Sequence, residues 1–216
     1  MNRTWGVVLW WLVIAVAAAV AFRFTPQARA QVGQGLALSE ILASPARDWN
    51  GDGVFDARKD EWAEIWNSGA GPVDLSAYRL ADADSTIRYE FSGSLAAGSV
   101  ALVLGSMAED QQRGLGHTVT GLSLNNAGDT VILFHIEGTD TVAVDSRKYG
   151  SIEGANDRSV GRMGDAGTWV LFDGLNKYTG SGDPKGTGCN PTPGVRNGCP
   201  SSVIGTTWGK IKSLYR

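Results

Sequence analysis

The sequence is poor in the residues from which metal-dependent hydrolases usually build their active sites. It contains only two histidines, His117 and His135, and they lie far apart along the chain. Catalytic zinc sites usually draw on histidine, so this scarcity argues against a metal-dependent hydrolase. The chain also lacks G-x-S-x-G, Walker and H-E-x-x-H motifs, so it carries no signature of a serine hydrolase, a P-loop nucleotidase or a zinc protease.

Positive charge is also in short supply. The whole chain has 19 basic and 22 acidic residues. Without residues 1–30, which contain Arg3, Arg23 and Arg29 and no acidic residue, 16 basic residues face 22 acidic ones, a net charge of −6. Sequence-independent nucleic-acid binding needs cations that face phosphates, so the composition makes no strong case for a nucleic-acid partner.

The N-terminus carries the features of a targeting segment. Arg3 precedes an uncharged apolar run of 18 residues from Trp5 to Phe22, and Ala-Arg-Ala at 28–30 offers a small-residue cleavage site. This pattern predicts a secretory signal peptide over residues 1–30. The run also reaches the lower limit for spanning a bilayer, so an uncleaved membrane anchor stays open as an alternative. Either reading predicts an exported protein, secreted or held in the cell envelope.

Only two cysteines are present, and they flank a short loop. Cys189 and Cys199 enclose the segment N-P-T-P-G-V-R-N-G. In an oxidising compartment so close a pair predicts one disulfide. Closing a loop of this size contributes about 2–3 kcal/mol and pins the C-terminal segment.

No stretch within residues 31–200 shows a convincing helical period. Short apolar runs separated by Gly, Asn, Asp and Pro instead predict a β-sandwich. The chain has 29 glycines, yet aromatic and β-branched residues remain plentiful. That mixture favours a turn-rich all-β domain over disorder. The sequence I-E-G-T-D-T at 136–141 resembles a hairpin loop. The expected strands are 37–43, 61–66, 78–82, 87–91, 100–105, 129–136, 141–146, 159–163 and 168–172.

The C-terminal end differs from the domain. Residues 180–202 are rich in Gly, Pro, Ser and Thr and predict a coil that closes the domain and leads outward. Within residues 201–216, a linker precedes a short amphipathic helix with cationic residues on its other side. Its apolar face consists of Trp208, Ile211, Leu214 and Tyr215. Such a helix needs a covering surface, and a membrane interface or a partner protein would supply one.

The densest group of oxygen ligands lies in the stretch D-W-N-G-D-G-V-F-D-A-R-K-D-E. Acidic and amide residues stand at alternate positions around Gly53, the arrangement by which calcium loops aim oxygens inward. The candidate ligands are Asp48, Asn50, Asp52, the Val54 carbonyl, Asp56, and Asp60 or Glu61 as the closing residue. The pattern departs from an EF-hand because Lys59 stands at the closing position and no helical period flanks the loop. We therefore expect a structural rather than catalytic Ca²⁺ site, with a metal-free Asp/Asn/Gly turn as the alternative.

Two strand-borne glutamates also bear on catalysis. Glu40 and Glu64 would make an acid/base pair if they met, but nothing in the sequence brings them together. We expect them to face solvent or to cap the calcium loop.

Several separated stretches together resemble the bacterial lamin-tail domain. They are L-S-E-I-L-A-S-P, the D-x-N-G-D-G loop, D-E-W-A-E-I-W-N, V-D-L-S-A-Y-R-L-A-D, L-A-A-G-S-V-A-L-V-L-G, L-S-L-N-N-A-G-D-T-V-I-L-F-H-I-E-G and P-T-P-G-V-R-N. They follow the family's order from about residue 36 to residue 198. The resemblance implies an immunoglobulin-like β-sandwich that serves as a binding, anchoring or localisation module without catalytic residues of its own. The chain has no coiled-coil heptads, so lamin-like filament formation is not implied.

These observations predict three parts: a signal or anchor at 1–30, a lamin-tail-type sandwich at 31–200, and a linker with a helix at 201–216. The expected function is a non-enzymatic adhesion or cell-envelope localisation module, stabilised by Ca²⁺ and a disulfide. Its partner would be an extracellular protein or glycan, or the envelope surface. Membrane contact is expected only through an uncleaved N-terminal segment or the C-terminal helix. The alternative is a small secreted metal-dependent hydrolase of the nuclease or phosphoesterase type.

Overall fold

The structure of this chain is a computed structural model that describes residues 35–164 and 167–199. Two predicted elements lie outside the described residues, namely the signal or anchor at 1–30 and the short helix within 201–216. In the described part of the chain, no helix is long and apolar enough to cross a membrane.

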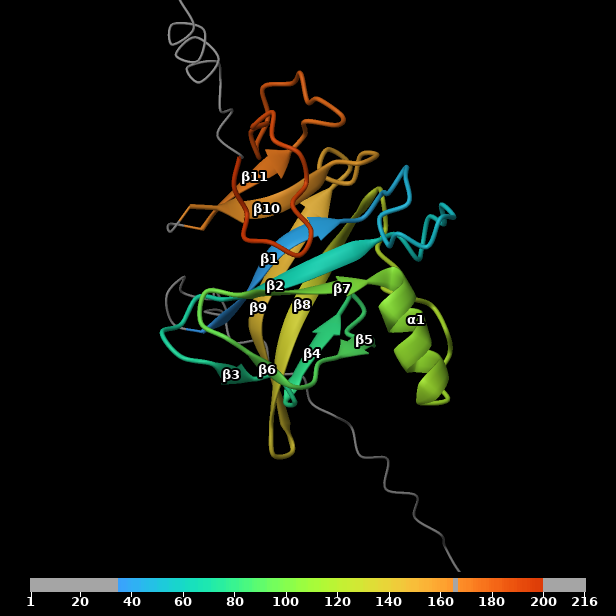
Figure 1. The fold of residues 1–216 in the computed structure, drawn as a ribbon, viewed down its shortest axis with the longest axis vertical. Helices are drawn as coiled ribbons and strands as arrows, with labels where there is room; N and C mark the ends of the chain where they lie inside the picture. Colours follow the sequence, from blue (N-terminus) through green and yellow to red (C-terminus); the bar gives the residue numbers. More distant parts are fainter. Residues whose placement is uncertain (1–34, 165–166, 200–216) are drawn as a thin grey trace, which may run out of the picture.

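The largest sheet is antiparallel and has β1 at its centre (Figure 1). Its strand order is β11-β10-β1-β2-β7. The bounds are β1 (Leu36–Leu42), β2 (Trp62–Asn67), β7 (Val100–Leu104), β10 (Ser159–Met163) and β11 (Thr168–Phe172). Strands from the two ends of the domain thus meet in one sheet, because β10 pairs with β1 across more than one hundred residues of sequence.

The second sheet has the order β5-β4-β8-β9. Its strands are β4 (Tyr78–Ala81), β5 (Ile87–Glu90), β8 (Gly128–Glu137) and β9 (Asp140–Gly150). β8 and β9 form the expected hairpin, and Gly138 takes a φ of 63° in its turn. A small separate ladder joins β3 (Val73–Asp74) to β6 (Ser94–Leu95). These two-residue strands escaped prediction because they are too short to show an alternating pattern.

The two sheets share one apolar core, which makes the fold the predicted immunoglobulin-like β-sandwich. Leu38, Ile65 and Val103 enter the core from the first sheet, and Leu80 and Leu133 enter it from the second. All five side chains are almost wholly buried. Burial of each large aliphatic side chain contributes about 1.5–3 kcal/mol, so this contact between sheets is the main stabilising element.

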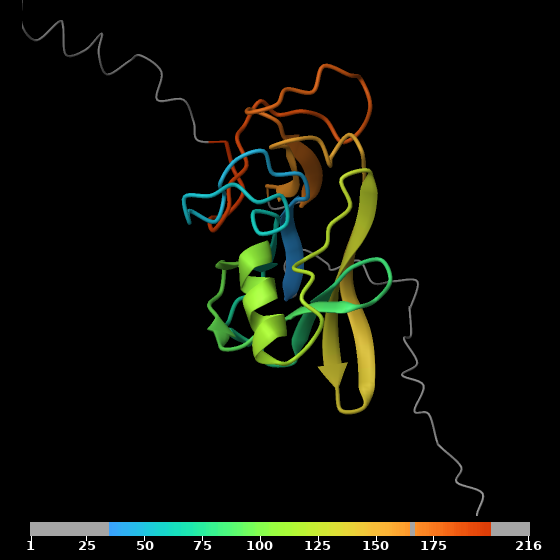
Figure 2. The same ribbon diagram turned by 90° about the vertical axis from the view of Figure 1, so that its right-hand side faces the viewer.

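The prediction that residues 31–200 contain no helix was wrong. Helix α1 (Gly105–Gly114) follows β7 directly and covers one edge of the sandwich near β5 (Figure 2). Its buried residues are Gly105, Ala108 and Gln112, so the inward face carries little apolar volume and shows no apolar period. The Gln112 side-chain amide instead donates to the carbonyls of Arg88 and Gly121. Polar anchoring of this kind is invisible to a search for hydrophobic periodicity.

Candidate functional site

The predicted calcium loop lies between β1 and β2. The Asp48 carboxylate accepts hydrogen bonds from the amides of Gly51 at 2.6 Å and Gly53 at 2.8 Å. Gly51 and Gly53 have φ values of 76° and 88°, a region that side-chain-bearing residues rarely adopt. Asp52 Oδ1 accepts from the Val54 amide at 2.8 Å. The alternation of acids and glycines therefore builds a series of tight side-chain-to-backbone turns.

Asp60 organises this loop from the interior. The residue is fully buried. One carboxylate oxygen accepts from the amides of Trp49 at 2.8 Å and Asn50 at 2.9 Å. The other accepts from the Asp56 amide at 2.7 Å. Asp56 in turn accepts from the amides of Arg58 and Lys59, and these hydrogen bonds lower the pKa of Asp56.

Glu61 does not join the loop through its side chain. Its carboxylate accepts a hydrogen bond from the amide of Leu124 at 3.2 Å and lines a different pocket. Five of the side chains predicted as calcium ligands thus lie in one loop, whereas the Glu61 side chain points to a different pocket. The five are Asp48, Asn50, Asp52, Asp56 and Asp60, and Val54 lies among them with its side chain exposed.

The donor set of the loop fits calcium in chemical type and spacing, because Ca²⁺ takes carboxylate, amide and carbonyl oxygens. In the described ranges, however, no three His, Cys, Asp or Glu side chains lie close enough together to hold a metal ion. The convergence of these oxygens on one point therefore stays a prediction.

The two strand glutamates are buried, and the expectation that they face solvent or cap the calcium loop was wrong. Glu40 on β1 and Glu64 on β2 are both 0 % exposed. A C-terminal segment covers them, which we call the closing segment (residues 187–199). Its Thr192 amide and hydroxyl donate to Glu40, and its Gly194 amide donates to Glu64. Sequence reasoning missed this contact because the covering residues lie 130 or more positions away.

The buried position changes the acidity of both glutamates. Burial raises the pKa of Glu40. Burial, with a smaller contribution from the neighbouring Glu40 carboxylate, raises the pKa of Glu64 to about 8. Among the described residues, Glu64 Oε2 has no hydrogen-bond partner. The pair is inaccessible to a substrate, and its carboxyl groups hold the closing segment on the sheet.

The closing segment has further attachments. Cys189 and Cys199 form the predicted disulfide, with their Cα atoms 5.2 Å apart. The Asn197 side-chain amide donates to the carbonyls of Ser39 at 3.0 Å and Arg162 at 2.9 Å. The Arg196 guanidinium lies 4.3 Å from the centre of the Trp66 ring. A segment without regular secondary structure is thus fixed in place by side chains.

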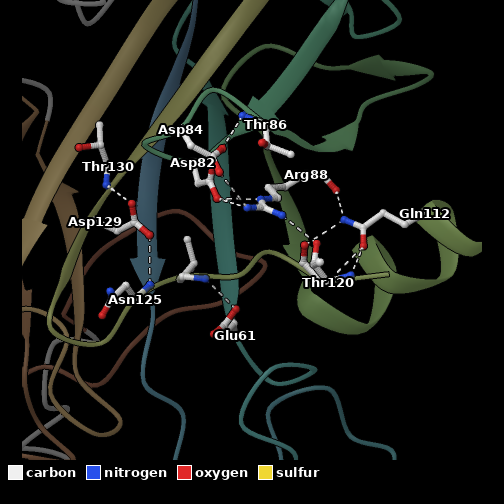
Figure 3. A network of polar contacts seen from close by, with 12 residues as sticks. Glu61, Asp82, Asp84, Thr86, Arg88, Gln112, Thr120, Asn125, Asp129 and Thr130 are labelled. Atoms are coloured by element: carbon white, nitrogen blue, oxygen red, sulfur yellow. Dashed lines mark hydrogen bonds and ion pairs between the residues drawn. The ribbon is translucent and has the colours of Figure 1, made fainter. Parts of the chain in front are cut away.

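A polar pocket of about 400 Å³ opens beside β2, β4 and β5 (Figure 3). Its charged lining residues are Arg58, Glu61, Asp82, Asp84, Arg88 and Asp129. They come from the loop before β2, the β4–β5 connection, β5 and the start of β8. The sequence shows acidic residues at the ends of three predicted strands, but it gives no indication that these strand ends lie close together. Only the pairing of the strands brings them to one place.

Arg88 organises one wall of this pocket. Its Nε donates to Asp82 Oδ2 at 2.7 Å, and its Nη1 donates to Thr120 Oγ1 at 2.8 Å. Asp84 Oδ2 lies 3.7 Å from the same guanidinium. Burial and then the adjacent Asp84 carboxylate raise the pKa of Asp82 to about 6.

The opposite wall contains Glu61 and Asp129. Glu61 is 4 % exposed, and burial raises its pKa to about 8. Asp129 accepts from the amides of Asn125 at 3.1 Å and Thr130 at 2.7 Å. Figure 3 shows these carboxylates grouped around the same opening as Asp82 and Asp84.

Comparison with known families gives one result. The chain matches the family described as Lamin Tail Domain over residues 29–151, which is more than half of its length. No curated protein matches the chain. The matched range ends just after β9, so β10, β11 and the closing segment lie beyond it while completing the same sandwich.

Proposed function

This chain belongs to the lamin tail domain family, whose immunoglobulin-like fold supports a non-enzymatic binding or localisation module, and we propose that it serves this role outside the cell. Its partner would be an extracellular protein or glycan, or a component of the cell envelope. The proposed export depends on the targeting pattern of residues 1–30.

The observation that carries the proposal is the use made of the buried carboxylates. Asp60 holds the loop that follows β1 through three backbone amides. Asp157 accepts from the Ala46 amide and from the Trp49 indole, both at 2.9 Å. Asp173 accepts from the amides of Tyr178 and Gly188. These carboxylates accept hydrogen bonds from backbone amides, and Asp157 also accepts one from an indole, so they fix loops and are not free to act on a substrate.

The loops held in this way carry exposed apolar side chains. On the loop before β2, Val54 is 66 % exposed and Phe55 is 51 % exposed. On the closing segment, Val195 is 57 % exposed. Large apolar side chains on ordered loops are a feature of protein-interaction surfaces. The loops between β1 and β2 and after β11 gather at the upper end of the domain in Figure 1, and we propose this end as the binding surface.

A binding assay on the mature chain tests this function. The wild-type protein should be retained by a cell-envelope fraction of the producing organism, and Phe55→Ser should reduce the retained amount several-fold. Met107→Ser, which changes an exposed apolar residue on α1, should leave it unchanged. Equal retention of both variants and wild type would show that the loop surface is not the contact. Turnover of DNA, phosphoesters or polysaccharide in a panel assay would instead support the hydrolase alternative.

We also propose that Ca²⁺ stabilises the loop of residues 48–60, with Asp48, Asn50, Asp52, Asp56, Asp60 and the Val54 carbonyl as ligands. Calcium should raise the melting temperature, and Asp52→Ala should abolish that rise because it removes one oxygen donor. Asp74→Ala is a matched control, since Asp74 forms the same kind of turn with the Ser76 amide at 2.9 Å in another loop. A melting curve that is identical with calcium and with chelator would remove the calcium proposal.

A further inference from the structure

The pocket in Figure 3 has an excess of negative charge that its own residues do not balance. The carboxyl groups of Asp82, Asp84 and Asp129 outnumber the two guanidinium groups of the lining, and Glu61, whose pKa burial raises to about 8, adds a fourth carboxyl group. Arg88 is already engaged by Asp82 and by the Thr120 hydroxyl. Only Ala83 and Leu124 contribute apolar side chains to the lining. A ligand of this pocket is therefore expected to be polar and cationic rather than apolar or anionic.

One oxygen of the pocket lacks a partner. Asp82 is 5 % exposed, and among the described residues no donor reaches its buried Oδ1, because its neighbour on that side is the Asp84 carboxyl group, which is itself an acceptor. Buried polar atoms in native proteins are nearly always satisfied, so this atom indicates that a donor from outside the chain completes the site. The adjacent Asp84 carboxylate is mostly exposed and contributes a second acceptor at the entrance.

The charged residues that line the pocket favour one class of cation, an organic ammonium group, over a metal ion. A directly ligated divalent metal ion is disfavoured, because two guanidinium groups among the lining residues offset part of the carboxylate charge that it would need. The pocket is also larger than a single ion requires. A primary ammonium group offers three hydrogen-bond donors and no acceptor, and it is compact enough to lie between carboxylates.

We propose that this pocket binds a primary ammonium group carried on a flexible chain, with Asp82 Oδ1 and the Asp84 carboxylate accepting its hydrogen bonds. Asp129 supplies the negative charge of the opposite wall. A lysine side chain of a partner protein and a free polyamine present the same group, and they are separated by experiment. This site is distinct from the apolar loop surface and extends the proposed binding function to a second, electrostatic contact.

Calorimetric titration of the whole mature chain at low ionic strength tests the inference, with spermidine and an acetylated Gly-Lys-Gly amide as probes. Wild type should bind at least one of the two, and Asp84→Asn should weaken binding about tenfold or more. Asp84 is 65 % exposed on its side chain, so this variant should fold normally. Asp110→Asn on α1, with a side chain 79 % exposed, is the charge-matched control and should bind as wild type does.

Further probes separate the sources and the alternatives. Binding of the peptide alone identifies a lysine side chain as the ligand, and binding of both probes identifies the ammonium group irrespective of its carrier. A trimethyllysine peptide keeps the charge but has no N–H donors, so it should bind about tenfold more weakly. Failure of both probes to bind, equal loss in Asp110→Asn, or equal binding of the trimethylated peptide would each overturn the inference. Envelope retention through Phe55 is measured separately, so either proposal can fail while the other stands.

Discussion

Replacement of Glu64 by glutamine should stabilise the protein in a strongly pH-dependent way. Glu64 is fully buried beside Glu40. One of its oxygens accepts from the Gly194 amide, and the other has no partner within residues 35–164 and 167–199. A glutamine of nearly the same shape keeps the acceptor for Gly194. Its amide nitrogen supplies an N–H donor at every pH, whereas Glu64 supplies an O–H donor only while it is protonated.

The magnitude follows from the difference in proton binding between the folded and unfolded states. Burial raises the pKa of Glu64 to about 8 from the ordinary value of 4.5. Between these values the folded state binds one proton more than the unfolded state. The free energy of unfolding therefore falls as pH rises through this window, by about 1.4 kcal/mol per pH unit for one group. Glutamine does not titrate, so the unfolding free energy of the variant does not include this decrease with pH.

The measurement is urea unfolding of wild type and Glu64→Gln at about pH 5.5 and about pH 7.5, with the disulfide intact. Relative to wild type, the variant should gain about 3 kcal/mol in unfolding free energy between the two pH values. Asp110→Asn, an acid-to-amide change at an exposed helix position, should show no such gain. If the difference between Glu64→Gln and wild type were the same at both pH values, Glu64 would not be held in its protonated form, and the reasoning would fail.

Three further predictions concern the helix, the cysteines and the C-terminus. Gly105→Ala should destabilise the domain by about 3 kcal/mol in thermal or urea unfolding, because its new methyl group would collide with a backbone carbonyl. Gly114→Ala, which points into open space, should stabilise by up to about 1 kcal/mol, and equal effects of the two would contradict the packing of α1. Mass spectrometry of exported protein without reductant should find Cys189 and Cys199 resistant to alkylation, and two reactive thiols would contradict this. Deletion of residues 206–216 should leave the melting temperature nearly unchanged while altering localisation; a loss of several kcal/mol with unchanged localisation would instead make this segment part of the folded core.

Local patterns of the sequence were sufficient to locate the longer strands and to pair the cysteines, but not to find the two-residue strands β3 and β6. In β2, Ala63 and Ile65 alternate with Trp62, Glu64 and Trp66, and the first pair enters the shared core as the alternation predicts. β9 was predicted to end four residues too early, because the exposed Ser146 and Lys148 interrupt its apolar pattern while pairing to β8 continues. The cysteine pairing could be predicted without knowledge of the geometry, since the chain has only two cysteines.

Contacts between distant segments were decided by the tertiary structure alone. Helix α1 depends on Gln112, whose partners lie on β5 and in the loop after the helix, so no window of sequence reveals it. Glu40 stands two residues after the core residue Leu38, so strict alternation would turn it inward, and the register shift between Leu38 and Ile41 breaks that alternation. Glu64 alternates with the core residues Ala63 and Ile65, and alternation therefore places it on the outer face of β2. The outer face is covered and not exposed to water because residues 187–199 pack over it. The local sequence of β1 and β2 does not predict this packing.

The polar pocket depends most strongly on contacts between segments that are distant in sequence. Glu61 and Asp82 lie in two different connections and Asp129 lies at the start of β8, and strand pairing rather than sequence spacing brings them together. The sequence by itself determined the fold class, because strand alternation and glycine turns are local properties of the backbone and of side-chain burial. The tertiary structure decided which carboxylates are buried together, because burial and electrostatic proximity arise only after the sheets have packed.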